Sequence, residues 1–428
     1  MIKRMSFKKK LIIVLCTALL CAYMYVFDPS RPITLTIGFY ADSPWDVPYA
    51  SPYKVIDHAI ERFEKIYPNV TITYESGISK SEYSSWLSNQ IVEAKQPDVF
   101  LVPEDDFNLL SSTRVLEDLS SRIIDDHLFV DDFFDCAYQA GTYSDYQYAL
   151  PYECNPTLMC VNNDLLKTKG IDVKGEHLTT AEFSRICEKV TDIKKGLFGE
   201  TNYTWRNAIQ AYGAKLFDET GSTCYFNTTG TRQALSYAAD LYALKGNYKV
   251  TSRDFDAGNV AFIPMTLAEY RTYLPYPYRV AKYSTFNWTC IEMPTKDDEC
   301  HTPVQTSLFA MSAKSMHKDL AWEFLKLLTT DQETQKDLMA VSSGSSVLKS
   351  VVSSHDSQII IDTDEMSANA LSNETLLSIM NHGTVMPYFK KFTASMKYAD
   401  YLIADSLGKG TIDMDLAEIQ RKMQNYLK

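Results

Sequence analysis

The chain alternates short apolar, strand-like runs with amphipathic helical segments over most of its length. Residues 33–40 alternate apolar and polar positions, which predicts a strand. From residue 51 a helix follows, with apolar side chains three and four positions apart. A second strand at residues 70–74 completes a strand–helix–strand unit. Because neighbouring parallel strands need such a connection, the chain is expected to open with a parallel sheet and a right-handed crossover.

Similar elements alternate along the rest of the chain. We predict further strands at residues 99–102, 260–265, 289–294 and 307–312. We predict further helices at residues 81–94, 107–110, 181–191, 231–244, 318–328, 389–407 and 413–427, with another that begins at 202–205. This pattern indicates the α/β class, and a length of 428 residues indicates two or three domains. Ligands bind at the carboxyl ends of strands in such folds, so the loops after Tyr40 and Val102 are expected near the site.

Residues 147–166 combine strand-like ends with a polar middle between Pro151 and Pro156. Proline biases the residue before it toward extended backbone, so Leu150 and Asn155 are expected to be extended. One interpretation is a crossover between two lobes with exposed polar groups. The other is a buried strand followed by a loop. The stretch alone leaves both interpretations open.

The N-terminus carries a membrane-targeting signal. Five basic residues precede an uncharged run from Leu11 to Phe27, which is long for a signal peptide and just short of a comfortable membrane span. The basic flank predicts that the rest of the chain lies outside the cell membrane. No small residue precedes Cys16 or Cys21, so we expect an uncleaved anchor or an atypical signal within residues 1–32 rather than a standard lipoprotein.

Composition and charge narrow the class of function. The apolar content of 45% and the net charge of −12 indicate an acidic globular protein, and argue against nucleic-acid partners and broad adhesion to anionic lipid. Beyond the N-terminal segment the cysteines show no Cys-x-x-Cys spacing, so no zinc or redox centre is predicted. Cys290 and Cys300 bracket a polar loop and could form a disulfide, although we favour free thiols.

The sequence offers little support for catalysis. It holds no Gly-x-Ser-x-Gly, His-Glu-x-x-His or Gly-Lys-Ser/Thr motif. Carboxylate pairs such as Asp105/Asp106 and Asp131/Asp132 fit a glycosidase, but such pairs are common on acidic surfaces. We therefore expect no catalytic residue, no metal site and no cofactor, and a glycosidase is the weakest alternative.

Several short motifs along the chain resemble those of one family. They are Glu61–Val70 (a turn like FEKxYPxI), Gln96–Phe100 (like GPDV), Val115–Leu119 (like GxLxDL), Ala149–Pro151 with Val161–Leu166 (like ALP…YNKDLL), Lys318–Leu325, and Thr384–Pro387 before a helix. In this order and spacing they resemble the family 1 extracellular solute-binding proteins of ATP-driven importers, and the maltodextrin-binding relatives in particular.

The resemblance covers residues 33–428 and implies a type II periplasmic-binding-protein-like α/β fold. In that fold two lobes are joined by crossover segments, and the ligand cleft lies between them. The implied division is the N-terminal segment 1–32, an N-terminal lobe of residues 33–150 with 303–348, and a C-terminal lobe of residues 151–302 with 349–428. The resemblance favours the crossover interpretation of residues 147–166.

Four positions depart from the family pattern. Arg114 replaces a glycine and Val161 replaces a tyrosine. Ala268 and Met396 fall roughly where the maltodextrin-binding relatives carry stacking tryptophans. We therefore do not expect maltodextrin itself to be the ligand.

Carbohydrate binding requires flat aromatic faces and planar acceptors for pairs of hydroxyl groups. The positions that combine these groups with the implied cleft are Tyr40, Asp42, Trp45, Asp105, Glu153, Asn155, Trp205, Tyr270 and Tyr388. Trp45 is the strongest aromatic candidate because its neighbours are polar, and polar neighbours are unusual in a core. Asp105 follows a buried strand. Trp86 and Trp322 lie on helices, where packing is the expected role.

The resemblance implies that the chain captures a solute, expected to be an oligosaccharide, by hinged closure of the lobes. It would deliver the ligand to the permease subunits of an ABC importer. We expect a monomer on the extracellular face of a bacterial cell membrane, anchored or secreted through its N-terminal segment. The alternative is a membrane-anchored sensor for a signalling partner. The sequence leaves open which sugar binds, and whether a polyamine or a metal takes its place.

Overall fold

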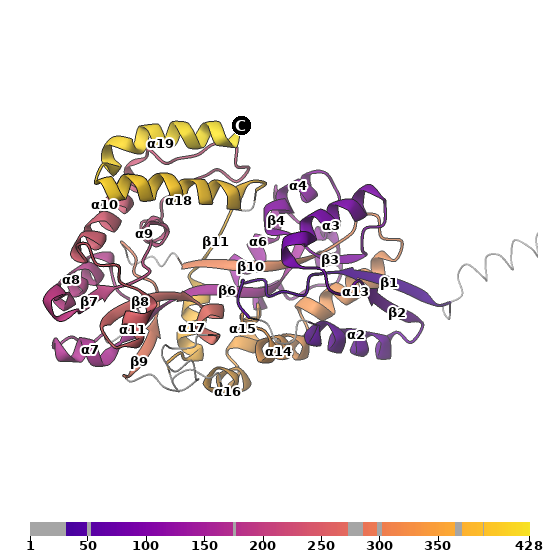
Figure 1. Cartoon of the computed structure of the whole chain (residues 1–428). Helices are drawn as coiled ribbons and strands as arrows, with labels where there is room; N and C mark the ends of the chain where they lie inside the picture. The colour runs from indigo at the N-terminus through magenta and orange to yellow at the C-terminus, as the bar shows by residue number, and fades with distance from the viewer. Residues whose placement is uncertain are drawn as a thin grey trace, which may run out of the picture.

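Two α/β lobes lie side by side and are joined by extended segments of chain (Figure 1). A computed structural model describes residues 31–48, 53–173, 177–272, 286–297, 302–363, 370–387 and 389–428. The predicted N-terminal segment spans residues 1–32, and its residues 1–30, which include the apolar run, lie outside this described part. Among the described residues, no helix has both the length and the apolar character that a membrane span requires.

The strands are β1 (Ile33–Gly38), β2 (Val70–Tyr74), β3 (Val99–Leu101), β4 (Thr142–Tyr143), β5 (Tyr146–Gln147), β6 (Ala149–Asn162), β7 (Phe198–Glu200), β8 (Val260–Thr266), β9 (Trp288–Ile291), β10 (Thr302–Met311) and β11 (Gly383–Val385). The helices are α2 (Lys54–Ile66), α3 (Lys80–Val92), α4 (Phe107–Ser112), α5 (Ser120–Asp125), α6 (Asp135–Ala140), α7 (Asn163–Thr168), α8 (Thr180–Val190), α9 (Trp205–Ala211), α10 (Thr229–Leu244), α11 (Ser252–Asp256), α12 (Leu267–Arg271), α13 (Lys318–Thr329), α14 (Gln332–Val341), α15 (Lys349–Val352), α16 (His355–Thr363), α17 (Asn373–Asn381), α18 (Phe392–Lys409) and α19 (Ile412–Leu427). Short 3₁₀ turns η1 to η3 span Glu104–Asp106, Val130–Asp132 and Ile193–Lys195.

The N-terminal lobe is built on a hydrophobic core that joins β1, β2 and β3 to α2, α3 and α13. β1 pairs in parallel with both β2 and β3, so the predicted strand–helix–strand unit is confirmed. Leu35 and Ile37 alternate with exposed residues along β1 and fill this core. The alternation fixes which face of the strand is buried, because successive side chains point to opposite faces.

The C-terminal lobe has its own core, which joins β8 to α8, α9, α10, α18 and α19. α8 begins with a capping box, in which Thr179 and Glu182 satisfy each other's backbone N–H groups. α18 and α19 pack against each other at the C-terminal end of the chain (Figure 1). The sequence pattern does not predict α14 to α17, which lie below the two crossing strands in Figure 1.

β6 and β10 connect the two lobes as one continuous ladder. β10 pairs with β3 of the N-terminal lobe and with the first half of β6. The second half of β6 pairs with β8 and β9. The sheet order is β2-β1-β3-β10-β6-β8-β7, with β11 on β10 and β9 on β6. The sheet therefore passes from one lobe to the other through a single 14-residue strand.

The expectation that the polar groups between Pro151 and Pro156 are exposed is wrong. This part of β6 is buried, and Glu153 and Asn155 are each 2% exposed. The polar groups are tolerated because hydrogen-bond partners from distant segments satisfy them, which removes most of the cost of burial. The crossover interpretation holds, since the strand does join the two lobes.

A third hydrophobic core joins α6 to α15, α17 and β9. α6 follows elements of the N-terminal lobe, whereas β9 belongs to the C-terminal sheet. This core therefore links the two lobes alongside the crossing strands. The domain limits given by the sequence analysis stay a prediction.

Candidate functional site

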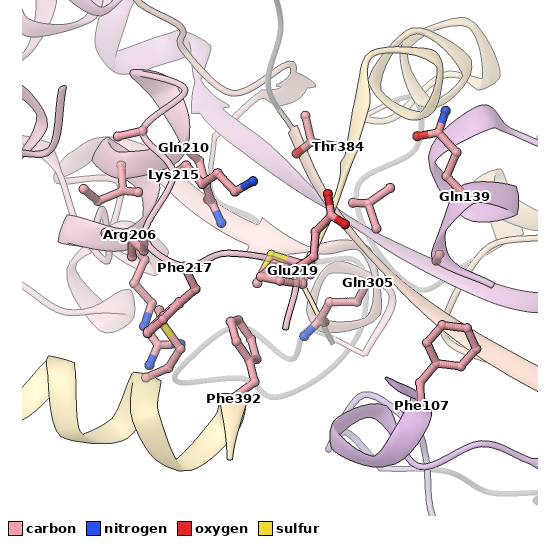
Figure 2. Close-up of a pocket in the computed structure, with 18 of the residues that line it drawn as sticks. Phe107, Gln139, Arg206, Gln210, Lys215, Phe217, Glu219, Gln305, Thr384 and Phe392 are labelled. Atoms are coloured by element: carbon pink, nitrogen blue, oxygen red, sulfur yellow. The ribbon is translucent and has the colours of Figure 1, made fainter. Parts of the chain in front are cut away.

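A cavity of about 1160 Å³ is lined by both lobes and by the strands that join them. The N-terminal lobe contributes α4, α6 and the β4–β5 turn. The C-terminal lobe contributes α9, the loop of residues 213–220 and the first turns of α18. Figure 2 shows Phe107 and Gln139 on one side, facing Arg206, Gln210 and Phe217 on the other. The cavity is therefore an interlobe cleft.

The crossing strands present isolated polar side chains to this cleft. Thr157 is the one residue of β6 that is not buried. Between Val304 and Met311 on β10, Gln305 is likewise the one exposed side chain. Both residues line the cavity. The strands thus form its floor and offer a hydroxyl and an amide from backbone that is fixed in the sheet.

The lining includes amide side chains and half-buried aromatic rings. The lining amides are Asn108, Gln139, Asn207, Gln210 and Gln305. Tyr143 of the N-terminal lobe and Phe392 of the C-terminal lobe are half-buried and lie on opposite lobes. Charged groups of both signs complete the walls, among them Lys215 and Glu219. Each amide offers both donors and acceptors, which suits neutral ligands rich in hydroxyl groups.

One carboxylate shapes the loop that carries Glu219. Asp218 accepts hydrogen bonds from the backbone N–H groups of Ser222 and Thr223. Burial raises the pKa of Asp218, but these bonds and those from nearby hydroxyls outweigh it, so that its pKa lies below the usual range. Gly221 has φ of +69°, and a Cβ there would lie 2.1 Å from the ring of Phe389. The loop conformation therefore requires glycine.

Trp205 supports the cleft from behind. Its Nε1 donates to Asp400 at 3.0 Å, and the same carboxylate binds the guanidinium of Arg206. Arg206 lines the cavity, whereas Trp205 is buried and does not. Asn155 acts in a similar way, since it donates to Gln305 at 3.2 Å and accepts from the N–H of Ala268 at 2.9 Å. Both predicted residues position cavity-lining side chains.

The two lobes touch directly at the edge of the cavity. Asp105 of η1 accepts from the hydroxyl of Thr393 on α18 at 2.9 Å, and from its backbone N–H at 3.3 Å. Asn108 donates to the carbonyl of Glu219 at 2.8 Å. The residue before α18, Lys391, makes no side-chain capping bond. Asp105 thus supplies a cap to this helix from the other lobe, where the helix dipole favours an anion. Burial is the main reason that the pKa of Asp105 is raised.

A buried carboxylate network lies beside the crossing strand. Glu153 accepts from Nε1 of Trp45 at 2.8 Å, from the N–H of Gly344 at 2.9 Å and from the hydroxyl of Ser342. A Cβ on Gly344 would lie 2.3 Å from Glu153, so this close approach requires glycine. Burial raises the pKa of Glu153, partly opposed by these bonds. The network joins the N-terminal loop to the segment after α14.

Trp45 is 8% exposed and buried. The expectation that its polar neighbours keep it out of a core is therefore wrong. Its indole N–H is satisfied by Glu153, while Ser43 accepts from its backbone N–H at 3.1 Å. Polar neighbours close the loop around the ring rather than exposing it.

The remaining predicted residues lie in different places. Tyr40 packs edge-on against Tyr83, and burial raises its pKa, as do nearby carboxylates such as Glu153. Asp42 accepts from the N–H of Lys80 at 2.6 Å. Tyr270 is 1% exposed and packs against a tryptophan ring in the C-terminal lobe. Tyr388 lies outside the described residues. None of the eight described residues predicted for the site is among those that line the cavity.

The lining residues that were not predicted include amides and threonines on helices, strands and loops. Their sequence neighbourhoods are ordinary, and only their convergence in space distinguishes them. One signal was present: Met396, a position where the family pattern departs, lines the cavity. Ala268, the other position where the maltodextrin-binding relatives carry a stacking tryptophan, is buried. In the described part of the chain, no group of three or more His, Cys, Asp or Glu side chains could hold a metal ion.

Residues 49–335 match the family of bacterial extracellular solute-binding proteins. The chain belongs to this family. A maltotriose-binding protein of Pyrococcus abyssi is 23% identical over 303 residues, which are 69% of this chain and 63% of that relative. The chain thus spans less than two thirds of this relative's length. The family assignment made from the sequence is confirmed.

Solved structures of solute-binding proteins share the fold. A cyclic α-maltosyl-1,6-maltose binding protein from Arthrobacter globiformis superposes with a TM-score of 0.75 at 17% identity, covering 93% of this chain and 99% of that one. The sugar-binding protein MalE from Xanthomonas citri gives 0.75 at 14% identity, covering 92% and 97%. The predicted two-lobe, type II α/β fold is confirmed.

Proposed function

We propose that the protein captures a carbohydrate, most simply an oligosaccharide, in the interlobe cavity and delivers it to the permease subunits of an ABC importer. The observation that carries this proposal is the lining of the cavity: amides from both lobes, with Tyr143 and Phe392 on opposite sides. Amides pair with sugar hydroxyls, and half-buried rings offer faces for the C–H surfaces of a sugar. A relative that binds maltotriose and structural neighbours that bind maltose-type sugars support the same ligand class.

Capture by lobe closure follows from the contacts at the cavity edge. A ligand that touches both lobes stabilises the conformation in which both walls are in place. We further propose that the protein has no catalytic activity, acts as a monomer, and remains at the extracellular membrane face through its N-terminal segment. Chromatography of oligosaccharides incubated with the protein tests the first point, because a cleaved product would contradict it.

Direct titration tests the ligand class. The purified protein is screened for thermal stabilisation by mono- and oligosaccharides, with polyamines and divalent metals included. A sugar present at one hundred times its dissociation constant should stabilise the fold by about 2.7 kcal/mol. Stabilisation by a polyamine or a metal, with none by any sugar, would contradict the proposal while leaving the family unchanged.

Replacement of Gln210 by alanine is expected to weaken sugar binding about threefold to tenfold, which corresponds to the loss of one hydrogen bond. Gln210 is half-buried and lines the cavity from α9. Isothermal titration with the best sugar from the screen measures the change. Gln332→Ala is the matched control, because Gln332 bonds Ser350 on the exposed side of α14. Equal affinities for the two variants would count against this cavity.

Replacement of Asp105 by alanine is expected to weaken binding by a similar factor without removing any contact to the ligand. The variant loses the cap that crosses from η1 to Thr393, so the closed conformation becomes less favourable. Thr393→Ala keeps the backbone N–H bond to Asp105 and should show a smaller loss, and the double variant should lose little more than Asp105→Ala. Asp106→Ala is the control, because Asp106 bonds Ser84 within its own lobe. Additive losses from Asp105→Ala and Thr393→Ala would show that the two side chains act separately.

A further inference from the structure

Two buried cysteines face each other across neighbouring strands of the C-terminal lobe. Cys160 on β6 and Cys290 on β9 are direct partners in the antiparallel register. Their sulfur atoms are 3.8 Å apart, and the residues are 0% and 5% exposed. Among the described cysteines, this is the pair whose sulfurs approach within 4 Å of each other. Both are thiols in the structure.

The pairing geometry suits a covalent bond. In an antiparallel ladder, partners either exchange both backbone hydrogen bonds or make none with each other. The N–H of Cys290 donates to the carbonyl of Ala370 at 2.6 Å, so it points away from β6. Cys160 and Cys290 therefore form a non-hydrogen-bonded pair, for which the Cα atoms lie about 4.5 Å apart. That spacing falls within the range of disulfides, about 4.4–6.8 Å.

The chemical environment favours oxidation. The family to which the chain belongs is extracellular, and disulfides persist outside the reducing cytosol. We propose that Cys160 and Cys290 form a cross-strand disulfide in the exported protein. This pair differs from the Cys290–Cys300 bridge that the sequence alone allows, and Cys300 lies outside the described residues.

The bond requires an oxidant, which we take to be a small-molecule or protein disulfide. One cysteine thiolate attacks the oxidant disulfide and releases one thiol, giving a mixed disulfide. The second cysteine thiolate attacks this intermediate and releases the second thiol, so two thiols are oxidised and one disulfide is reduced. Burial raises the pKa of Cys160 well above its usual range, and the nearby Cys290 adds to this. The exchange is therefore expected while the chain folds, before the strands enclose both sulfurs.

The bond would fix β9 to the strand that joins the lobes. It closes a loop between residues 130 positions apart in the sequence, which restricts the unfolded chain and so stabilises the fold. β9 pairs with β6 along Trp288–Ile291 and contributes Trp288 and Cys290 to the core shared by the two lobes. Oxidation would thus make the attachment of β9 to the C-terminal half of β6, the strand that joins the lobes, more rigid.

Peptide mapping tests the proposal. The full chain is folded in a mixture of reduced and oxidised glutathione and then denatured in the presence of iodoacetamide, which alkylates free thiols. The protein is then digested and analysed by mass spectrometry. We expect the peptides containing Cys160 and Cys290 to be joined, two hydrogen atoms lighter than the separate thiols, and to separate on reduction. Alkylation of both cysteines without prior reduction would overturn the proposal. So would a bridge from Cys290 to any other cysteine.

Thermal unfolding gives an independent readout. Dithiothreitol should lower the melting temperature of the oxidised wild type by several degrees. It should leave that of the double variant Cys160→Ala/Cys290→Ala unchanged. Cys187→Ala is the control, because Cys187 is a buried thiol in another part of the lobe, and it should retain the wild-type response. An equal response in the double variant and the wild type would overturn the proposal.

Discussion

Replacement of Lys245 by methionine is expected to lower the free energy of unfolding by about 3–5 kcal/mol. Nζ of Lys245 pairs with the carboxylate of Glu200, and the two side chains are 15% and 2% exposed. Methionine preserves most of the apolar stem but leaves the carboxylate buried without a cation. The backbone N–H of Tyr203, 3.2 Å from Glu200, does not neutralise that charge. The loss therefore measures an uncompensated buried charge.

Urea unfolding followed by circular dichroism measures this change. Lys195→Met is the matched control: it removes a pair between an exposed lysine and the half-buried Asp192, and less than about 1 kcal/mol should be lost. Adding Glu200→Gln to Lys245→Met should restore much of the stability, because the pair is then replaced by neutral groups. If Lys245→Met costs no more than Lys195→Met, the ion pair is not a buried element of the C-terminal core.

The elements of the two lobes could largely be predicted from local pattern. Alternation along residues 33–38 and apolar spacing in α2 specify a strand and a helix by themselves. Thr179 and Glu182 mark the start of α8 by a side-chain mechanism that the sequence shows directly. Such features act over three or four residues. The order of the elements then indicates the fold, because parallel pairing of β1 with β2 requires the intervening helix.

The crossing strand shows where local pattern fails. Glu153 and Asn155 are polar, and their sequence neighbours give no sign that they are buried. Their partners come from far along the chain: Ser342 and Gly344 for Glu153, Ala268 for Asn155. Polar burial is decided by those distant partners. A continuous strand thus looks like a broken one in the sequence.

The cavity is hidden from the sequence for a similar reason. Asn207 and Gln210 lie one turn apart on α9, a pattern that any solvated helix face shows. Several predicted residues nevertheless touch the true lining, as Trp205 does through Asp400 and Asn155 through Gln305. Trp205 and Asn155 thus lie one residue behind the side chains that line the cavity, and the predicted ligand contacts stay a prediction.

Replacement of Glu153 by alanine is expected to lower the free energy of unfolding by about 3–5 kcal/mol. The variant leaves the indole N–H of Trp45, the hydroxyl of Ser342 and the N–H of Gly344 without their common acceptor. Glu153 and its partners are buried, so water does not replace the carboxylate without rearrangement. Glu153→Gln keeps an acceptor oxygen and should cost much less. Urea unfolding of the three proteins at neutral pH measures the difference.

The pH dependence of the same variants separates this carboxyl group from its surroundings. Burial raises the pKa of Glu153 in the folded protein, so between the unfolded value and the folded one the folded state binds more protons. Its contribution to stability therefore falls as pH rises above the ordinary carboxyl range, about pH 4. Glu153→Gln removes this fall, so the stability of the variant relative to wild type should improve as pH rises.

Glu182→Gln should show the opposite pH dependence. The pKa of Glu182 is lowered, first by the backbone N–H of Thr179, so the contribution of Glu182 to stability is lost as pH falls. If the stability of Glu153→Gln relative to wild type changed with pH in the same direction as that of Glu182→Gln, the hydrogen bonds would outweigh the burial of Glu153. The network would then favour the charged form of this carboxyl group.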